Sequence, residues 1–280
     1  MAREAVQWIR RKTSPWFIYV PFFAVHIPVD APEEYKRLYA GVNFDDDAVK
    51  HDSLLRLAAF VTQLDTKAGE FVAALDETGQ RRDTLIVFTS DNGGLPGSKN
   101  PYVGKVADSP VLSSNVPLRG HKNTLYEGGV RVSAFANWPG KLAPHKLTAP
   151  LHAADWMPTL TKLAGWQPPT DLKFDGLDAW PLLTGAVEKP APRTIYIPHP
   201  SGAIVLHDGW KLIARKAAKR GSPAVELFHV ADDPFEKQDL ASEEPQRVKQ
   251  LQVLLAALRA GDLKEMPKDA GDGAVDKADK

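Results

Sequence analysis

The segment that follows the apolar run from Thr84 to Ser90 carries the side chains best suited to hold a metal ion. The run is rich in β-branched residues, which predicts a buried strand, and it ends in Asp91, Asn92 and two glycines. In open α/β sheets, ligands bind just beyond the carboxyl ends of the strands. The oxygen atoms of Asp91 and Asn92 are of the kind that Ca²⁺ or Mg²⁺ prefers. The same residues are also typical of a plain turn, so this motif alone leaves both interpretations open.

Two further segments contain side chains that could act on a charged substrate. Lys122 lies in an Arg-Gly-His-Lys sequence that precedes Glu-Gly-Gly-Val-Arg. Lysine can meet an anionic oxygen as a point charge, although most lysines are solvated surface residues. His26 follows an apolar segment and precedes Ile-Pro. Histidine suits proton transfer near neutral pH, although a lone histidine at a strand end is more often structural.

In this order, the three segments around His26, Asp91 and Lys122 resemble the sulfatase family. The closest resemblance is to arylsulfatases of the N-acetylgalactosamine-4-sulfatase type, and it covers about residues 3–262. It implies an alkaline phosphatase-like α/β fold and hydrolysis of sulfuric esters. It also implies that Asp91 and Asn92 are metal ligands, as half of a Ca²⁺ site. Lys122 and His26 would then be catalytic and substrate-binding residues that contact the sulfate, with His26 protonating the leaving oxygen.

Glu127 and Arg131 belong to the same Glu-Gly-Gly-x-Arg segment, which strongly resembles the family. Their side chains are expected to brace the loop that carries Lys122 rather than to touch the substrate. The intervening glycines, Gly128 and Gly129, permit backbone conformations that other residues cannot adopt. They do not predict a phosphate cradle, because no Lys-Ser/Thr at the start of a helix follows them.

The nucleophile of the family is missing from this sequence. Family members carry an Asp-Asp metal pair, a Gly-Lys-x-His segment and a Cys/Ser-x-Pro-Ser-Arg motif whose first residue is oxidised to formylglycine. This chain has no cysteine, no Ser-x-Pro-Ser-Arg and no Gly-Lys-x-His. We therefore expect the C-terminal part of a sulfatase, inactive by itself: a truncated sequence, one half of a split enzyme or a decayed copy. A complementing N-terminal sulfatase polypeptide is the implied partner, and without it exposed strand edges predict poor solubility.

Other functions are compatible with the same residues. One is a non-catalytic remnant that binds a sulfated glycan or a partner chain through the retained half-site. Another is a phosphatase or phosphodiesterase of the same superfamily, but those enzymes hold two metals with further Asp and His ligands. The substrate is expected to be an aryl or sugar sulfate ester. Trp138 and Trp180 could stack on a sugar ring or belong to the core.

Composition sets broad limits. The 280 residues include 43% hydrophobic and 25% charged residues, which is typical of globular proteins. Lys+Arg and Asp+Glu number 35 each, so the bulk charge does not favour nucleic acid or an anionic membrane as a partner. No apolar run approaches the roughly 18 residues of a membrane span. The basic start has no apolar core of a secretory signal, which leaves localisation open, although family members are often periplasmic, secreted or lysosomal.

The elements that must position these side chains follow from hydrophobic periodicity. Residues 3–12 are typical of a helix end, and Trp16–Val20 alternates like a strand. A helix from Asp52 or Ser53 to Gly79 has apolar residues at spacings of three and four. Since the strand 84–90 follows, a strand–helix–strand unit and a parallel sheet are expected.

Downstream, a strand is predicted over 131–138 and a helix over 152–164. Three short strands within 203–228 and a helix over 248–258 predict a small antiparallel sheet with a terminal helix. The predicted fold class is therefore α/β, with an incomplete mixed sheet flanked by helices. The predicted domains are residues 1–190, the C-terminal part of the α/β domain, and residues 191–263, the small sheet and helix. Residues 264–280 are predicted to be a disordered tail.

Overall fold

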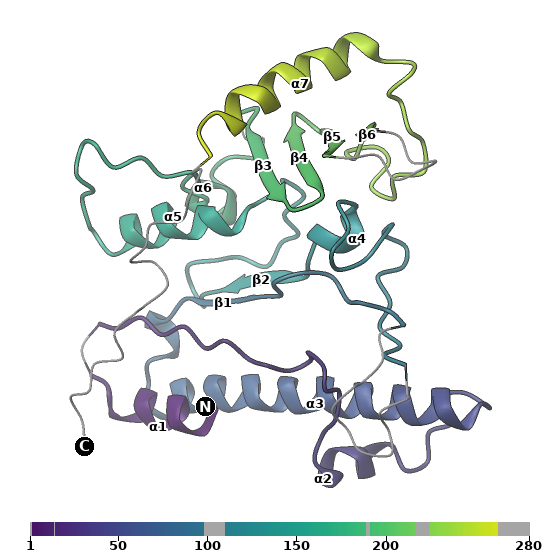
Figure 1. The fold of residues 1–280 in the computed structure, drawn as a ribbon. Helices are drawn as coiled ribbons and strands as arrows, with labels where there is room; N and C mark the ends of the chain where they lie inside the picture. Colours follow the sequence, from purple (N-terminus) through teal and green to yellow (C-terminus); the bar gives the residue numbers. More distant parts are fainter. Residues whose placement is uncertain (1, 14, 98–109, 189–190, 217–223, 263–280) are drawn as a thin grey trace, which may run out of the picture. The chain divides into compact units, whose positions relative to one another are not determined.

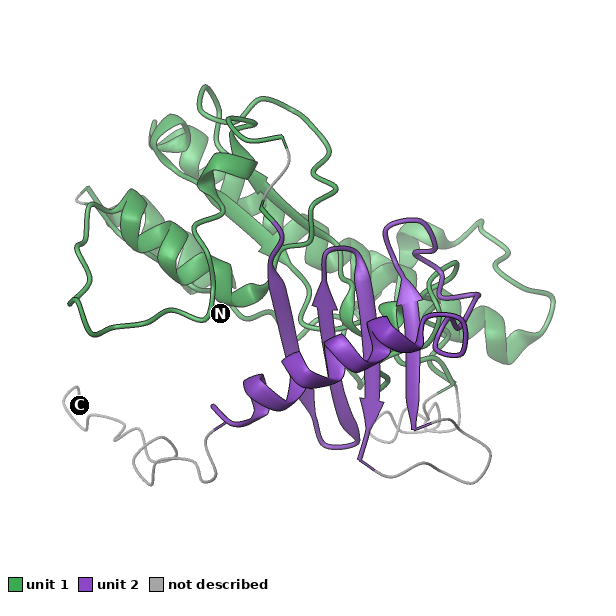
Figure 2. Ribbon diagram, turned by 90° about the horizontal axis from the view of Figure 1, so that it is seen from above, with its two compact units in different colours: residues 1–191 green, residues 192–280 purple. Residues whose placement is uncertain are grey.

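The computed structural model describes residues 2–13, 15–97, 110–188, 191–216 and 224–262. The chain divides into two compact units, residues 1–191 and 192–280, which Figure 2 shows in different colours. The sequence predicts a boundary after residue 190. The predicted disordered tail lies outside the described residues.

Helix α3, Ala48–Glu77, is the longest element, and its 30 residues give a length of about 45 Å. Asp47 caps it, since its carboxylate accepts hydrogen bonds from the N–H groups of the second and third helical residues. The predicted start five residues later is wrong, because Asp52 lies inside the helix and pairs with Arg56 at 2.8 Å. The helix ends just before Gly79, whose φ of +71° suits a helix stop.

Shorter helices pack against α3 (Figure 1). Helix α1, Ala2–Arg11, buries apolar side chains against the C-terminal part of α3, and its Arg10 pairs with Glu77 at 2.7 Å. Helix α2, Glu33–Lys36, and the 3₁₀ turn η1, Arg37–Tyr39, contact α3 near its middle. The residues buried in this second cluster are Val29, Ala31, Tyr35, Ala59 and Phe60. The flanking helices that the fold class predicts are therefore present.

The segment 16–20 is not a strand, and the prediction of one is wrong. One side of the segment packs on the rest of unit 1, where Trp16 Nε1 donates a hydrogen bond to Gln80 Oε1 at 2.9 Å. The other side faces outwards, with Phe17 73% and Tyr19 76% exposed. The alternation that suggested a strand is real, but no neighbouring strand of the described chain pairs with it. An extended segment without a hydrogen-bonded neighbour does not become a strand.

Strands β1, Ile86–Thr89, and β2, Ala134–Asn137, form a two-stranded antiparallel sheet with Ile86 opposite Asn137. Both strands lie within their predicted ranges, and the 3₁₀ turn η2, Arg81–Asp83, precedes β1. Phe88 stacks on Phe135 across the sheet, with ring centroids 5.2 Å apart. The expected parallel pairing is absent from the described residues, because the segment before α3 forms no strand.

Asp155 joins two loops of unit 1. It lies in the 3₁₀ turn η4, Ala153–Asp155, which leads into helix α5, Trp156–Leu163, within the predicted helix. Its buried carboxylate accepts hydrogen bonds from the backbone N–H groups of His152 at 2.7 Å and Leu177 at 2.9 Å. A side chain on Gly176 would fall on the carbonyl oxygen of Ala154. The close contact holds the chain that enters helix α6, Trp180–Leu183.

Unit 2 is a meander of four antiparallel strands in the order β3-β4-β5-β6. Their bounds are Thr194–His199, Gly202–His207, Trp210–Arg215 and Val225–His229, and the first strand is absent from the prediction. Asp208 and Gly209 both have positive φ in the turn between β4 and β5, which suits a type I′ hairpin. Helix α7, Pro245–Arg259, crosses one face of the sheet (Figure 2) and buries Leu251 and Leu255 there.

The turn between β6 and α7 is held by carboxylates. Asp233 accepts hydrogen bonds from two backbone N–H groups of the turn, at 2.7 and 3.0 Å. Asp239 Oδ1 accepts from the N–H groups of Leu227 and Ala241, both at 3.0 Å. Glu236 pairs with Lys211 of β5 at 2.7 Å, and both side chains are at most 1% exposed. The carboxylates of Asp239 and Glu236 therefore connect this turn to the sheet.

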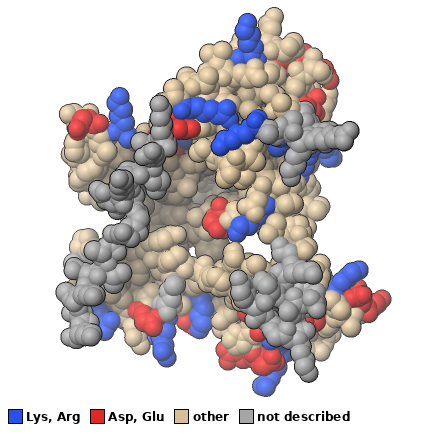
Figure 3. All heavy atoms as spheres, viewed as in Figure 1, with Lys and Arg blue, Asp and Glu red and all other residues tan. Residues whose placement is uncertain are grey.

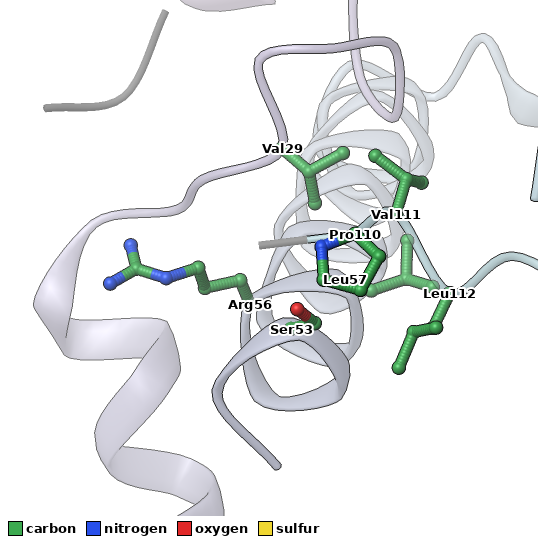
Figure 4. A pocket seen from close by; sticks show the side chains of 7 residues that line it. All are labelled: Val29, Ser53, Arg56, Leu57, Pro110, Val111 and Leu112. Atoms are coloured by element: carbon green, nitrogen blue, oxygen red, sulfur yellow. The ribbon is translucent and has the colours of Figure 1, made fainter. Parts of the chain in front are cut away.

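Residues 97 and 110–112 are brought together at the side of α3. The Gly97 N–H donates a hydrogen bond to the Val111 carbonyl at 2.8 Å, and Val111 packs on the cluster around Tyr35. Figure 4 shows Pro110–Leu112 facing Ser53 and other residues of α3 across a small hollow. Both ends of the segment 98–109 are thereby fixed at one place.

Basic and acidic side chains both occur on the face that Figure 3 shows. In the described part of the chain, no helix combines the length and the apolar character that a membrane crossing requires.

Candidate functional site

Asp91 and Asn92 follow β1 directly, where the sequence predicts a site. Asp91 is exposed, and its Oδ1 accepts a hydrogen bond from the Asn92 N–H at 2.9 Å. Ser90 Oγ donates to the Asn92 carbonyl at 3.1 Å, which closes a tight turn. No lysine or arginine of the described residues forms an ion pair with Asp91. The carboxylate therefore keeps oxygen atoms available to a cation.

The chain around Lys122 lies against this turn through backbone hydrogen bonds. The Lys122 N–H donates to the Gly94 carbonyl at 3.1 Å, and the Gly93 N–H donates to the Gly129 carbonyl at 3.1 Å. A Cβ on Gly93 would fall on the carbonyl oxygen of Gly128, in the short helix α4, Glu127–Val130. The approach of the two segments therefore requires glycine at this position. The structure thus brings Asp91 and Asn92 together with Lys122.

Lys122 is half-buried, and its ammonium group forms no ion pair or hydrogen bond within the described part of the chain. Its neighbours are engaged elsewhere. The Arg119 guanidinium lies over the Tyr126 ring, 3.9 Å from the ring centroid, and also donates to the tyrosine hydroxyl. Glu127 lies 3.8 Å from Arg131. A partly desolvated cation without a counter-charge is suited to receive an anion.

His26 is exposed in a turn, where its backbone N–H donates to the Phe23 carbonyl at 2.8 Å. Its Nδ1 lies 2.8 Å from the Ile27 carbonyl. Since a carbonyl oxygen only accepts, Nδ1 carries the proton in this contact and Nε2 is left to exchange one. Among the described residues, no hydrogen bond or ion pair links His26 to Lys122 or Asp91. Of the residues predicted from the sequence, Asp91, Asn92 and Lys122 therefore lie on segments that are hydrogen-bonded to each other. His26 lies in a separate turn.

Trp138 lies at the opposite end of the sheet from the candidate site. It follows β2, which runs antiparallel to β1, and its Nε1 donates to the Arg82 carbonyl before β1 at 2.7 Å. At about 3.3 Å per residue, the two ends of β1 and its flanks lie roughly 15–20 Å apart. The Trp138 ring packs against Trp180 at 5.7 Å instead. Of the two interpretations of these tryptophans, the strand register favours a structural role, because it places Trp138 away from Asp91.

Asn115 is the residue of this region that sequence reasoning missed. It lies in a segment for which the sequence predicts neither helix nor strand, and part of that segment falls outside the described residues. In the structure its side-chain amide contacts the backbone of Gly94 and of Gly120. An amide side chain that both donates and accepts is suited to such a role, but a single sequence does not show which backbone it will meet.

The donor set fits a calcium ion only in part. Asp91 and Asn92 supply hard oxygen atoms, but Ca²⁺ takes about 6–8 such ligands. Within the described residues, no group of three or more His, Cys, Asp or Glu side chains could enclose a metal ion. The chemistry of these two residues therefore suits Ca²⁺, and their number suits half of a site.

Comparison with known proteins gives consistent matches. The sulfatase family model matches residues 1–166. Arylsulfatase J of Mus musculus is 28% identical over 286 residues, which is 85% of this chain and 44% of that protein. Steryl-sulfatase of Mus musculus is 33% identical over 192 residues, or 68% of this chain and 28% of that protein. The chain thus spans less than half the length of these relatives.

The crystal structure of Ps i-CgsB in complex with k-i-k-neocarrahexaose is similar to 92% of this chain. The TM-score is 0.74 with 26% identity, and the match covers 53% of that protein. This similarity confirms the predicted alkaline phosphatase-like α/β fold class.

Proposed function

The chain belongs to the sulfatase family, and we propose that it carries one half of the active site of a sulfuric ester hydrolase acting on aryl or sugar sulfate esters. The observation that carries this proposal is the position of Lys122. This residue is half-buried, its ammonium has no hydrogen bond or ion pair in the described residues, and its backbone is hydrogen-bonded to the loop of Asp91 and Asn92. An anion bound there would meet a fixed cation beside two metal-binding oxygens.

The proposed roles follow from what each group can do. The Lys122 ammonium would hold one sulfate oxygen, whose charge must be stabilised as the sulfur–oxygen bond breaks. Asp91 and Asn92 would hold Ca²⁺, which supplies a second positive charge to the sulfate oxygens. His26 would give the proton from Nε2 to the leaving alcohol oxygen. The formylglycine nucleophile is absent from this chain, so the other half of the site must supply it.

We propose that a complementing N-terminal sulfatase polypeptide supplies that half and covers the open sheet of unit 1. A two-stranded sheet is marginal by itself, and unpaired edges beside exposed aromatic side chains favour association. Phe17, Tyr19 and Phe23 are exposed aromatics before α3, and Phe135 of β2 is 55% exposed. Sedimentation velocity on the isolated chain tests this: aggregation is expected, and a monodisperse, cooperatively melting monomer would contradict it.

Sulfate binding tests the role of Lys122. Inorganic sulfate is titrated into the full chain at a concentration low enough to limit the expected aggregation, with hydrogen exchange followed by mass spectrometry as the readout. Lys122→Met should weaken binding about tenfold to a hundredfold, the usual range for a lost charged hydrogen bond. Lys141→Met is the matched control, because Lys141 is exposed and forms no ion pair in the described residues. Equal affinities for Lys122→Met and the parent chain would refute the assignment.

The second candidate is a non-catalytic remnant that binds a sulfated glycan or a partner chain, and the same unpartnered Lys122 favours it. The native protein, purified from its source with whatever chain accompanies it, separates the two candidates. Release of p-nitrophenol from p-nitrophenyl sulfate supports the hydrolase. Sulfate binding without hydrolysis supports the remnant.

A further inference from the structure

Asn115 is bonded to the backbone on both sides of the candidate site. Its Oδ1 accepts a hydrogen bond from the Gly94 N–H at 2.8 Å. Its Nδ2 donates to the Gly94 carbonyl at 2.9 Å and to the Gly120 carbonyl at 3.3 Å. One side chain thus uses its acceptor and both of its donors.

These contacts complete a short connection between the two functional segments. Gly94 lies three residues after Asp91, and Gly120 lies two residues before Lys122. The Gly94 carbonyl, which Asn115 contacts, also accepts the hydrogen bond from the Lys122 N–H at 3.1 Å. The separation between the Asp91 carboxylate and the Lys122 ammonium therefore depends on where Asn115 holds Gly94.

The packing around the amide leaves little freedom. A Cβ on Gly93 would lie 3.0 Å from Asn115 Oδ1, and one on Gly94 would lie 3.5 Å from it. Asn115 itself is half-buried. The amide is therefore held between backbone segments, and a shorter side chain would leave the Gly94 N–H without its acceptor.

We propose that Asn115 is a positioning residue, which sets the distance and orientation of Lys122 relative to the oxygens of Asp91 and Asn92. The inference rests on the proposed function for the identity of the anion. The positioning itself depends only on the hydrogen bonds of Asn115 to the backbone of Gly94 and Gly120. It predicts that Asn115 affects anion binding only through Lys122.

The test compares Asn115→Ala with Ser114→Ala in the full chain. Ser114 is the exposed neighbour, and its hydroxyl accepts only a long hydrogen bond from the Val116 N–H at 3.3 Å. Two readouts are taken: amide hydrogen exchange at Gly94 and Lys122, and affinity for inorganic sulfate. Asn115→Ala should accelerate exchange at both amides and weaken sulfate binding about tenfold. Ser114→Ala should leave both unchanged.

A double variant separates positioning from general destabilisation. If Asn115 acts through Lys122, then Asn115→Ala combined with Lys122→Met binds sulfate no more weakly than Lys122→Met alone. A further loss of affinity in the double variant, or unchanged exchange at Lys122 in Asn115→Ala, overturns the proposal. If the parent chain binds no sulfate, the assignment of Lys122 as a sulfate-binding residue of this chain fails, and the exchange experiment still decides the role of Asn115.

If Asn115→Ala does not fold, Asn115→Asp replaces it. Aspartate keeps an acceptor for the Gly94 N–H but cannot donate to the carbonyls of Gly94 and Gly120. Faster exchange at Lys122 with retained protection at Gly94 is then the expected result. Unchanged exchange at Lys122 would overturn the proposal.

Discussion

Replacing Glu236 by glutamine should destabilise unit 2 more than any surface change. Glu236 Oε1 lies 2.7 Å from Lys211 Nζ, and the two side chains are 0% and 1% exposed. With an effective dielectric constant of about 20, Coulomb's law gives an attraction of about 6 kcal/mol at most. Desolvation of both groups offsets much of it in the parent chain. Glutamine would remove one charge of this buried ion pair, and breaking a buried ion pair in this way costs about 3–5 kcal/mol.

Hydrogen exchange followed by mass spectrometry measures this loss locally, in peptides that cover β4 and β5. The free energy of opening in those peptides should fall by about 3–5 kcal/mol in Glu236→Gln. Glu244→Gln removes the same charge from an exposed position whose side chain forms no cap hydrogen bond, and it should change stability by less than about 0.5 kcal/mol.

A double variant tests the physical reason for the loss. Lys211→Met added to Glu236→Gln removes the second charge of the pair, so the double variant should be at least about 1 kcal/mol more stable than the sum of the single losses predicts. Glu236→Gln within about 1 kcal/mol of the parent chain would refute the reasoning, because the buried Lys211 would then tolerate the loss of the Glu236 charge at little cost.

Three further changes have definite expected outcomes. Gly176→Ala should cost unit 1 about 1–3 kcal/mol in urea denaturation, because its Cβ would meet the Ala154 carbonyl. Gly69→Ala should raise the free energy of unfolding by up to about 1 kcal/mol in the same assay, because Gly69 is exposed inside α3 with nothing within 4 Å of a new Cβ. A lower free energy of unfolding would contradict this. For Asp30, burial raises the pKa, but the hydrogen bond and charge of Lys36 and the charge of Arg56 outweigh it, and the pKa lies below its ordinary 3.8. The contribution of Asp30 is therefore present above pH 3.8 and is lost as the pH falls through the lower folded value. Asp30→Asn should abolish this part of the acid sensitivity, measured as amide exchange in α2 between about pH 6 and pH 2; an unchanged pH profile would count against the assignment.

The sequence predicts a helix well where the spacing of apolar residues is regular over many turns. The spacing of apolar residues predicts α3 correctly, but its start depends on which carboxylate turns back to the first N–H groups. Asp47 does so, whereas Asp52 is drawn to Arg56. Which aspartate caps the helix depends on the side chains that surround it in the folded unit. The spacing of apolar residues carries no information about them.

The candidate site shows the same division between local and long-range information. The turn character of Asp91 and Asn92 is local and predictable. The role of Asn115 depends on its hydrogen bond with Gly94, which lies 21 residues away along the chain. The misplacement of Trp138 has a similar origin, because only the strand register shows at which end of the sheet a residue lies.

The fixed ends of the segment 98–109 have a consequence for how this protein could be altered. Gly97 and Val111 are hydrogen-bonded to each other, and Val111 is packed on α3. Whatever the intervening sequence, its ends start and finish at one anchored point. Substitution of Gly97 or Val111 would therefore act on this anchor, which lies three residues from Gly94 and four residues from Asn115 along the chain.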